Sequence, residues 1–148
     1  MAIKYEDLKS KIGEHLGYSE YHTVTQEQVN AFADATGDHQ WIHVDVERAK
    51  QGPFGGPIAH GYLTLSLTPM LLGQILEVSG IKLAVNYGAN KLRFPSPVPV
   101  GAKVRLGAKM LNVEDVAGGV QCTIEGSFEV EGATKPSCVV EFLFRYYV

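Results

Sequence analysis

Residues 58–78 have the sequence IAHGYLTLSLTPMLLGQILEV, and their central part, Leu63 to Leu76, is the longest apolar stretch of the chain. Apolar residues fall on every side of a helical projection, which predicts a helix enclosed by other structure. Pro69 lies inside this stretch and is expected to kink the helix. The stretch is short for a membrane span and contains several polar residues, so a buried helix suits it better.

The chain after Gly80 is predicted to form strands. Apolar residues alternate in one phase up to Tyr87 and in the other phase at Leu92 and Phe94, which indicates a bulge near Gly88-Ala89. A strand around 104–110 follows, then one at 120–130 with one polar face. The final strand, 138–148, is apolar at most positions and is expected to be covered on both faces.

The amino-terminal part is predicted to form shorter elements. A short helix at 5–10 and a strand at 17–24 precede Thr25 and Gln28, whose spacing is that of a capping box. The helix that starts there is expected to end at Gly37.

One more helical turn is expected at 46–51, capped by Asp45. A loop rich in glycine and proline follows at 52–57. One early strand, a long central helix and an antiparallel meander together predict an α+β fold, with residues 1–148 forming a single domain.

Composition excludes several classes of protein. The net charge of −3 over 148 residues, with scattered basic residues, argues against a nucleic-acid binder. Cys122 and Cys138 lack the close spacing of a zinc or redox pair and are expected to be reduced and packed. No export signal or membrane span is apparent, which predicts a soluble, cytoplasmic protein that does not bind membranes.

The candidate catalytic residues lie in two short segments. Asp38 and His43 are five positions apart in TGDHQWIHVD (36–45), and a carboxylate and an imidazole on one loop can jointly hold and deprotonate a water. Gly61, at the start of the buried helix, can aim its backbone N–H at a carbonyl oxygen. The combination predicts addition of water to, or its removal from, a substrate that a carbonyl activates.

These segments resemble the MaoC-like family of (R)-specific enoyl-CoA hydratases and dehydratases, whose hot-dog fold wraps an antiparallel sheet around a long central helix. The resemblance covers roughly residues 25–101. It rests on Gly37-Asp38 followed by Ile42-His43, on Ala59-His60-Gly61-Tyr62-Leu63, and on the segment LRFPSPVPVG at 92–101.

Two positions depart from the family pattern. Gln40-Trp41 stands where family members usually have Asn-Pro, so proline cannot be what makes this loop rigid. Pro69 stands where some members place a hydroxyl residue on the central helix, which puts that supporting contact in doubt.

The resemblance implies a role for each candidate. Asp38 and His43 would bind the water that attacks C3 of a trans-2-enoyl thioester, and Gly61 would donate to the thioester oxygen. Trp41 would form a wall of the acyl pocket. His60 would either shape the site entrance or be a satisfied core histidine.

The resemblance also suggests residues that bind coenzyme A. Asn86 and Asn90 would contact the pantetheine. Arg93, with Lys91 and Lys103, would contact the phosphates or else be a solvated strand-edge charge.

The activity implied is reversible hydration of trans-2-enoyl-CoA to (R)-3-hydroxyacyl-CoA by a homodimer, without metal or redox cofactor. Open edge strands in the meander must be paired or covered, which favours the dimer. Three alternatives remain open at this stage. They are a dehydratase acting on acyl-carrier-protein substrates, a hot-dog acyl-CoA thioesterase and a non-catalytic acyl-CoA-binding module.

Overall fold

The computed structural model describes residues 1–148 and contains a curved six-stranded sheet. The strands follow the order β2-β6-β7-β8-β5, and β3 also pairs with β6. Every strand pair in this sheet is antiparallel. The strands are β2 (His15–Tyr18), β3 (His22–Thr23), β5 (Leu83–Arg93), β6 (Lys103–Val116), β7 (Gly119–Val130) and β8 (Cys138–Tyr147).

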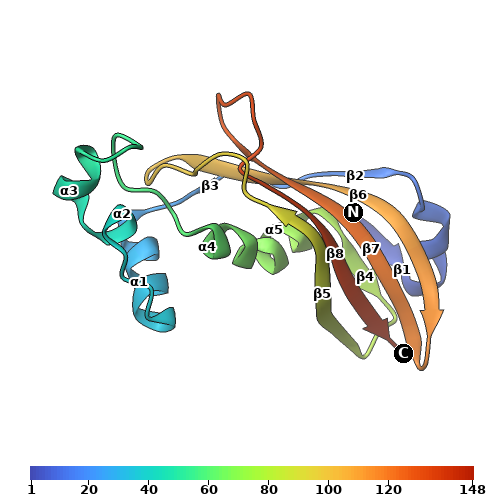
Figure 1. Ribbon diagram of the computed structural model, residues 1–148. Coiled ribbons are helices and arrows are strands. Elements are labelled where there is room, and N and C mark those ends of the chain that lie inside the picture. The colour runs from blue at the N-terminus through green and yellow to red at the C-terminus, as the bar shows by residue number, and fades with distance from the viewer.

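The sheet curves over a central helix, as the resemblance implies (Figure 1). The helix consists of two segments, α4 (Gly61–Ser66) and α5 (Thr68–Ile75), which meet at Leu67. Pro69 lies in the first turn of α5, where its missing N–H costs no helical hydrogen bond. The predicted kink is therefore a break in the helix at Leu67, just before the turn that contains the proline.

The helix is shorter than predicted at both ends. Ile58 forms a β-bridge with Pro99 instead of a helical turn. At the other end, β4 (Glu77–Ser79) pairs in parallel with β1 (Ala2–Lys4). Ile58 is buried and Val78 is partly buried against the core, so both extend the apolar pattern without being helical.

The helix is also less enclosed than predicted. Leu63, Leu71 and Ile75 are buried in the core, whereas Tyr62 and Met70 are 66% and 48% exposed. Within one chain the sheet therefore covers only one side of the helix.

Strands β6, β7 and β8 supply most of the strand residues in the core. Alternate residues of β6 and β7 are fully buried, as the sequence predicts, and Phe128 is the largest of them. The prediction that β8 is covered on both faces is wrong. Its residues alternate between buried and half-buried, because only one face of the sheet packs against the helix. The bulge predicted in β5 is present between Asn86 and Gly88.

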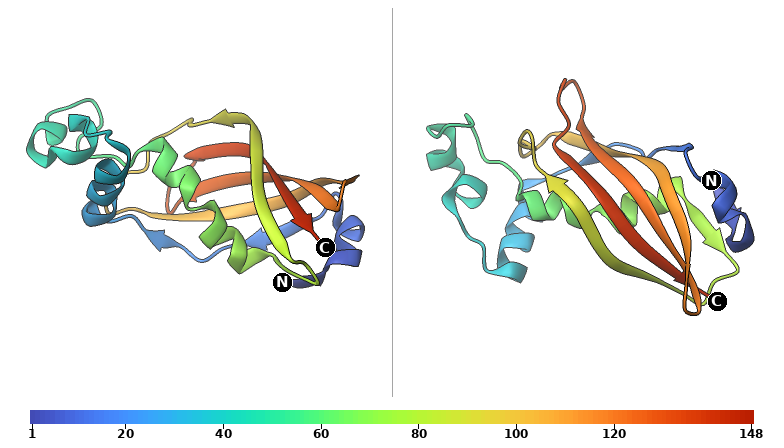
Figure 2. Two further views of the ribbon diagram at one scale, coloured as in Figure 1. Left: turned by 90° about the horizontal axis from the view of Figure 1, so that it is seen from below. Right: turned by 45° about the vertical axis from the view of Figure 1, so that its right-hand side comes forward.

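The amino-terminal elements mostly follow the sequence prediction. A 3₁₀ helix, η1 (Tyr5–Lys11), replaces the predicted short helix, and the predicted strand at 17–24 is split into β2 and β3. Three short helices follow β3, namely α1 (Gln26–Thr36), α2 (Trp41–Val44) and α3 (Val46–Lys50). They project beyond one end of the sheet, whereas η1 and both termini lie at the other (Figure 2).

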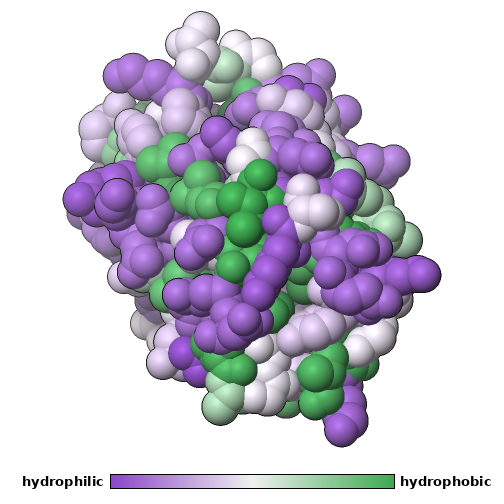
Figure 3. Space-filling view, turned by 90° about the vertical axis from the view of Figure 1, so that its right-hand side faces the viewer, coloured by the Kyte–Doolittle hydropathy of each residue, from purple (hydrophilic) through white to green (hydrophobic).

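The end of the molecule that carries the termini has a mostly polar surface with a small apolar patch (Figure 3). Cys122 and Cys138 are free and buried in the sheet, as predicted, and burial raises the pKa of each thiol to about 12. None of the helices has the length and apolar character that a membrane crossing requires.

Helix α1 is capped at both ends, and the cap at Gly37 fixes where the helix stops and the loop that carries Asp38 begins. The Thr25 hydroxyl accepts a hydrogen bond from the Gln28 backbone N–H at 3.1 Å, while the Gln28 side chain bonds His22 instead of closing the capping box. Gly37 ends the helix with a φ of 84°, a left-handed conformation that favours glycine.

We expect Thr25→Ala to lower the free energy of unfolding by about 1 kcal/mol, because the Gln28 N–H loses its acceptor. Thr25→Ser keeps the hydroxyl and is the matched control, expected to retain most of the stability. Urea unfolding followed by circular dichroism measures both. Equal stability of the alanine variant and the parent would show that the cap contributes nothing.

Candidate active site

The structure brings Asp38, His43 and His60 together at the end of the sheet where α1–α3 lie. One side-chain nitrogen or oxygen from each falls within 4.8 Å of those of the other two. His43 and His60 are 6% and 2% exposed, whereas the Asp38 side chain is about half exposed. The group thus combines two desolvated imidazoles with a carboxylate that remains accessible to water.

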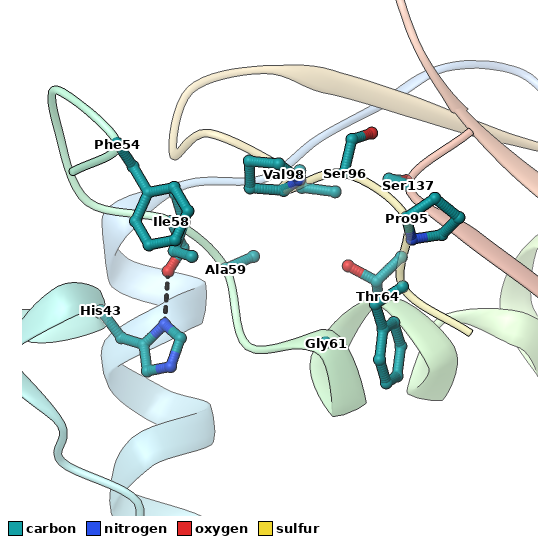
Figure 4. A pocket seen from close by; sticks show the side chains of 12 residues that line it. His43, Phe54, Ile58, Ala59, Gly61, Thr64, Pro95, Ser96, Val98 and Ser137 are labelled. Atoms are coloured by element: carbon teal, nitrogen blue, oxygen red, sulfur yellow. Dashed lines mark hydrogen bonds between the residues drawn. The ribbon is translucent and has the colours of Figure 1, made fainter. Parts of the chain in front are cut away.

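A short hydrogen bond fixes the protonation pattern of His43. Its Nδ1 lies 2.6 Å from the backbone oxygen of Ile58 (Figure 4). A carbonyl oxygen only accepts, so Nδ1 carries the hydrogen, and in the neutral ring Nε2 is left with a free lone pair. His43 therefore presents a proton acceptor.

The surroundings of His43 favour its neutral form. Burial lowers its pKa below the usual value, and the neighbouring His60 lowers it further, while the bond to Ile58 and the charge of Asp38 act in the opposite direction. The net pKa is below 6.5, so the ring is a base at neutral pH.

Gly61 lies at the start of α4, where its N–H has no partner within the helix. A side chain could not be added there without movement, since a Cβ atom on Gly61 would come within 3.0 Å of the Phe94 ring. The backbone is thus closely covered by Phe94. An unpaired N–H at a helix start is the kind of donor that stabilises negative charge on a carbonyl oxygen.

His43 and Gly61 line the same cavity, which has a volume of about 320 Å³ (Figure 4). Most of its other walls come from the loop before α4 and from the segment after β5. The remaining lining residues are Phe54, Ile58, Ala59, Thr64, Phe94, Pro95, Ser96, Pro97, Val98 and Ser137.

Sequence reasoning missed Thr64 and the two phenylalanines of this cavity. Thr64 is buried, and its hydroxyl points into the cavity from one turn after Gly61. The helical spacing of three residues would have placed it on the same face as Gly61. Phe54 and Phe94 are 49% and 42% exposed, and their exposure depends on loops that show no periodicity.

The structure does not bring the other predicted substrate-binding residues into this cavity within one chain. The Arg48 guanidinium lies over the Trp41 ring, with its Cζ atom 4.3 Å from the centre of that ring. Asn86 is exposed on β5 and lines two separate hollows beside α5. Arg93 is exposed, with Nη1 donating to the oxygen of its neighbour Leu92.

The remaining predicted cations also lie outside the cavity lining. Lys91 pairs with Glu141 at 3.6 Å, and Lys103 is exposed at the start of β6. Their predicted contacts with coenzyme A remain predictions.

The Asp38, His43 and His60 cluster also has the composition of a metal-ligand set. However, the two imidazole rings are stacked, with centres 3.9 Å apart and planes inclined by 23°. A metal ion lies close to the plane of each imidazole that binds it, so two nearly parallel rings cannot direct lone pairs at one tetrahedral centre. This arrangement fits acid–base chemistry better than metal binding.

Comparison with known proteins identifies the family of this chain. The family described as MaoC like domain matches residues 7–131. The 3-hydroxyacyl-thioester dehydratase Z of Mycobacterium tuberculosis is 57% identical over 141 residues, covering 95% of this chain and 93% of that protein.

Solved structures show the same fold. The (R)-hydratase from A. caviae involved in PHA biosynthesis superposes with a TM-score of 0.74 and 26% identity, over 90% of this chain and 94% of that one. A monoamine oxidase regulatory protein from Archaeoglobus gives a TM-score of 0.78 and 26% identity, over 100% and 97%.

The chain therefore belongs to the MaoC-like dehydratase family, and its sheet and central helix form the hot-dog fold of that family. It is a hydro-lyase, an enzyme that adds or removes water.

We expect the pKa values of the two histidines of the 38–43 loop to be shifted in opposite directions. Burial keeps the pKa of His43 below 6.5, whereas the hydrogen bond with Asp34 raises that of the exposed His39. Histidine ring signals followed by NMR against pH, assigned with His43→Gln and His39→Gln, measure both.

The same shift predicts a dependence of stability on pH. The unfolded chain takes up a proton at His43 near pH 6.5 and the folded chain only at lower pH, so this residue makes stability fall as the pH drops below about 6.5. A midpoint for His43 above 6.5 would contradict the assignment.

We expect Gly61→Ala to reduce kcat/KM by about 10-fold or more, because the new methyl group displaces the Phe94 ring or the helix start. Phe94→Leu in the same chain makes room for the methyl group and should restore part of the loss. Steady-state kinetics of the two single variants and the double variant test this. If the double variant is no better than Gly61→Ala, contact with Phe94 is not the cause.

Proposed function

We propose that the protein catalyses the reversible hydration of trans-2-enoyl-CoA to (R)-3-hydroxyacyl-CoA. The observation that carries this proposal is the shared cavity of His43 and Gly61, with Asp38 beside it. A base with a free Nε2 and an unpaired helix-start N–H belong to residues that line one cavity, which suits attack on a bond that a carbonyl activates.

In the hydration direction a water binds between the Asp38 carboxylate and Nε2 of His43. As its oxygen bonds to C3 of the enoyl group, the C2–C3 double-bond electrons move toward the thioester carbonyl, whose oxygen gains negative charge. The Gly61 N–H stabilises that charge. The proton taken from water by the pair is then delivered to C2, and the C=O bond re-forms.

The dehydration direction reverses these steps. The pair removes a proton from C2, the oxygen at C3 leaves as water with a returned proton, and the double bond forms. One site serves both directions because every group that takes a proton in one direction gives it back in the other. No step in this scheme requires a metal or redox cofactor.

The choice of thioester substrate draws on the relatives. The dehydratase Z of M. tuberculosis is named for 3-hydroxyacyl thioesters, and the structure from A. caviae for an (R)-hydratase. Asp38 and His43 lie close together, so the pair would deliver the hydroxyl group and the proton to the same face of the double bond. This suits the formation of a single enantiomer. Coenzyme A and acyl-carrier-protein substrates would undergo the same chemistry.

We also propose that the protein is a homodimer. Strand β5 forms one edge of the sheet, with Leu83 and Tyr87 more than half exposed. The side of the central helix that the sheet leaves open lies next to this strand and exposes Met70. Pairing of β5 with a second copy would satisfy its free backbone groups and cover both apolar surfaces.

The test is a crotonyl-CoA hydration assay that follows loss of the conjugated enoyl absorbance, with chiral analysis of the product. We expect (R)-3-hydroxybutyryl-CoA to form. Asp38→Asn and His43→Gln should each lower kcat by about 10²-fold or more, since a general acid or base is worth that much.

Matched controls come from the neighbouring ion pair of the same region. His39 and Asp34 bond each other at 3.0 Å and do not belong to the Asp38, His43 and His60 cluster, so His39→Gln and Asp34→Asn should keep near-parental rates. Near-normal rates in both Asp38→Asn and His43→Gln would refute the catalytic assignment. Release of free thiol without hydration would instead identify a thioesterase, and binding without turnover of any acyl thioester would identify a binding module.

A further inference from the structure

His60 is the most buried histidine near the candidate active site, and it contacts both proposed catalytic residues. Its Nε2 lies 2.9 Å from the backbone oxygen of Asp38. Because that oxygen only accepts, Nε2 carries the hydrogen and donates it. The same nitrogen lies 4.0 Å from a carboxylate oxygen of Asp38, so one N–H holds the backbone of Asp38 and faces its side chain.

The His60 ring also supports His43. The two imidazoles are stacked with centres 3.9 Å apart, and Phe32 of α1 packs against His60 with ring centres 4.9 Å apart. His43 is therefore held by its bond to Ile58 in the ring plane and by His60 against its face. These contacts leave the His43 ring little freedom to rotate.

The second nitrogen of His60 points to the reason for a histidine here. Nδ1 is buried and has no hydrogen-bond partner, the only buried side-chain nitrogen or oxygen in the structure of which this is true. An unpaired buried acceptor destabilises the fold, and an apolar ring would fill the same space without that cost. The N–H on the other side of the ring is what an apolar residue cannot supply.

We propose that His60 is a positioning residue that fixes Asp38 and His43 relative to each other. It does so through the Nε2–H bond to the Asp38 backbone, which sets where the carboxylate lies relative to the His43 ring, so that the carboxylate and the Nε2 of His43 meet at one water. This inference rests on the proposed roles of Asp38 and His43 and adds a residue that need not touch the substrate.

Two substitutions separate the hydrogen bond from the ring. His60→Gln can place an amide N–H close to the position of Nε2 but removes the ring, whereas His60→Phe keeps an aromatic ring and removes the donor. Crotonyl-CoA hydration measures both, with thermal unfolding as the check on the fold.

We expect His60→Phe to lower kcat by about 10-fold or more, because misplacement of catalytic groups by about 1 Å can cost as much as 10²-fold. KM should stay within about two-fold, since His60 does not line the cavity. His60→Gln should restore most of kcat.

Phe32→Leu is the packing control, because it loosens the same cluster and leaves the hydrogen bond in place. It should keep kcat within about three-fold of the parent. A loss as large as that of His60→Phe would mean that packing alone is responsible and would overturn the proposal. If His60→Phe does not fold, His60→Gln decides, and a loss of 10-fold or more in that variant would likewise overturn it.

Different results would refute the proposed function and the role of His60. A parent protein without hydratase activity, or one that is indifferent to Asp38→Asn, would refute the proposed function. An active parent that depends on Asp38 but is unaffected by both His60 substitutions would refute the role of His60 alone.

Discussion

The hydrogen bond from His43 Nδ1 to the Ile58 oxygen joins the two halves of the site. His43 belongs to the loop that follows α1, and Ile58 belongs to the segment that leads into the central helix. The bond ties the loop to the helix start and selects the tautomer with a free Nε2, and His43 lines the same cavity as Gly61. The proposed base and the proposed carbonyl donor thus depend on one contact for their alignment.

The packing of the central helix explains why the cavity lies at that end of the sheet. The apolar side of α4 and α5 must lie against the concave face of the sheet to be buried, which places the first turn of α4 beneath the segment after β5 (Figure 1). The unpaired N–H groups of a helix start are then held in a partly desolvated space. Phe94 closes over Gly61 so tightly that only glycine fits without movement.

The electrostatic design separates the three titratable groups by exposure. Asp38 remains accessible to water, while His43 and His60 are buried and stacked, and burial lowers the pKa of His43. Burial of His43 favours the neutral imidazole that its proposed role as a base requires. The unpaired Nδ1 of His60 indicates that stability was given up at this position for the geometry of its neighbours.

Local patterns in the chain predicted much of the fold. The Thr25 cap, the stop at Gly37, the bulge in β5 and the alternation of β7 depend on neighbouring residues alone, and the structure has each of them. The closeness of Asp38, His43 and Gly61 was an inference from motif spacing and resemblance, and only tertiary structure brings segments so far apart in sequence to one cavity. The early end of the central helix, the uncovered side of β8, the separation of Trp41 from the cavity and the stacking of His60 on His43 were decided by long-range packing, which a periodic pattern cannot encode because it records which side is apolar and not what covers it.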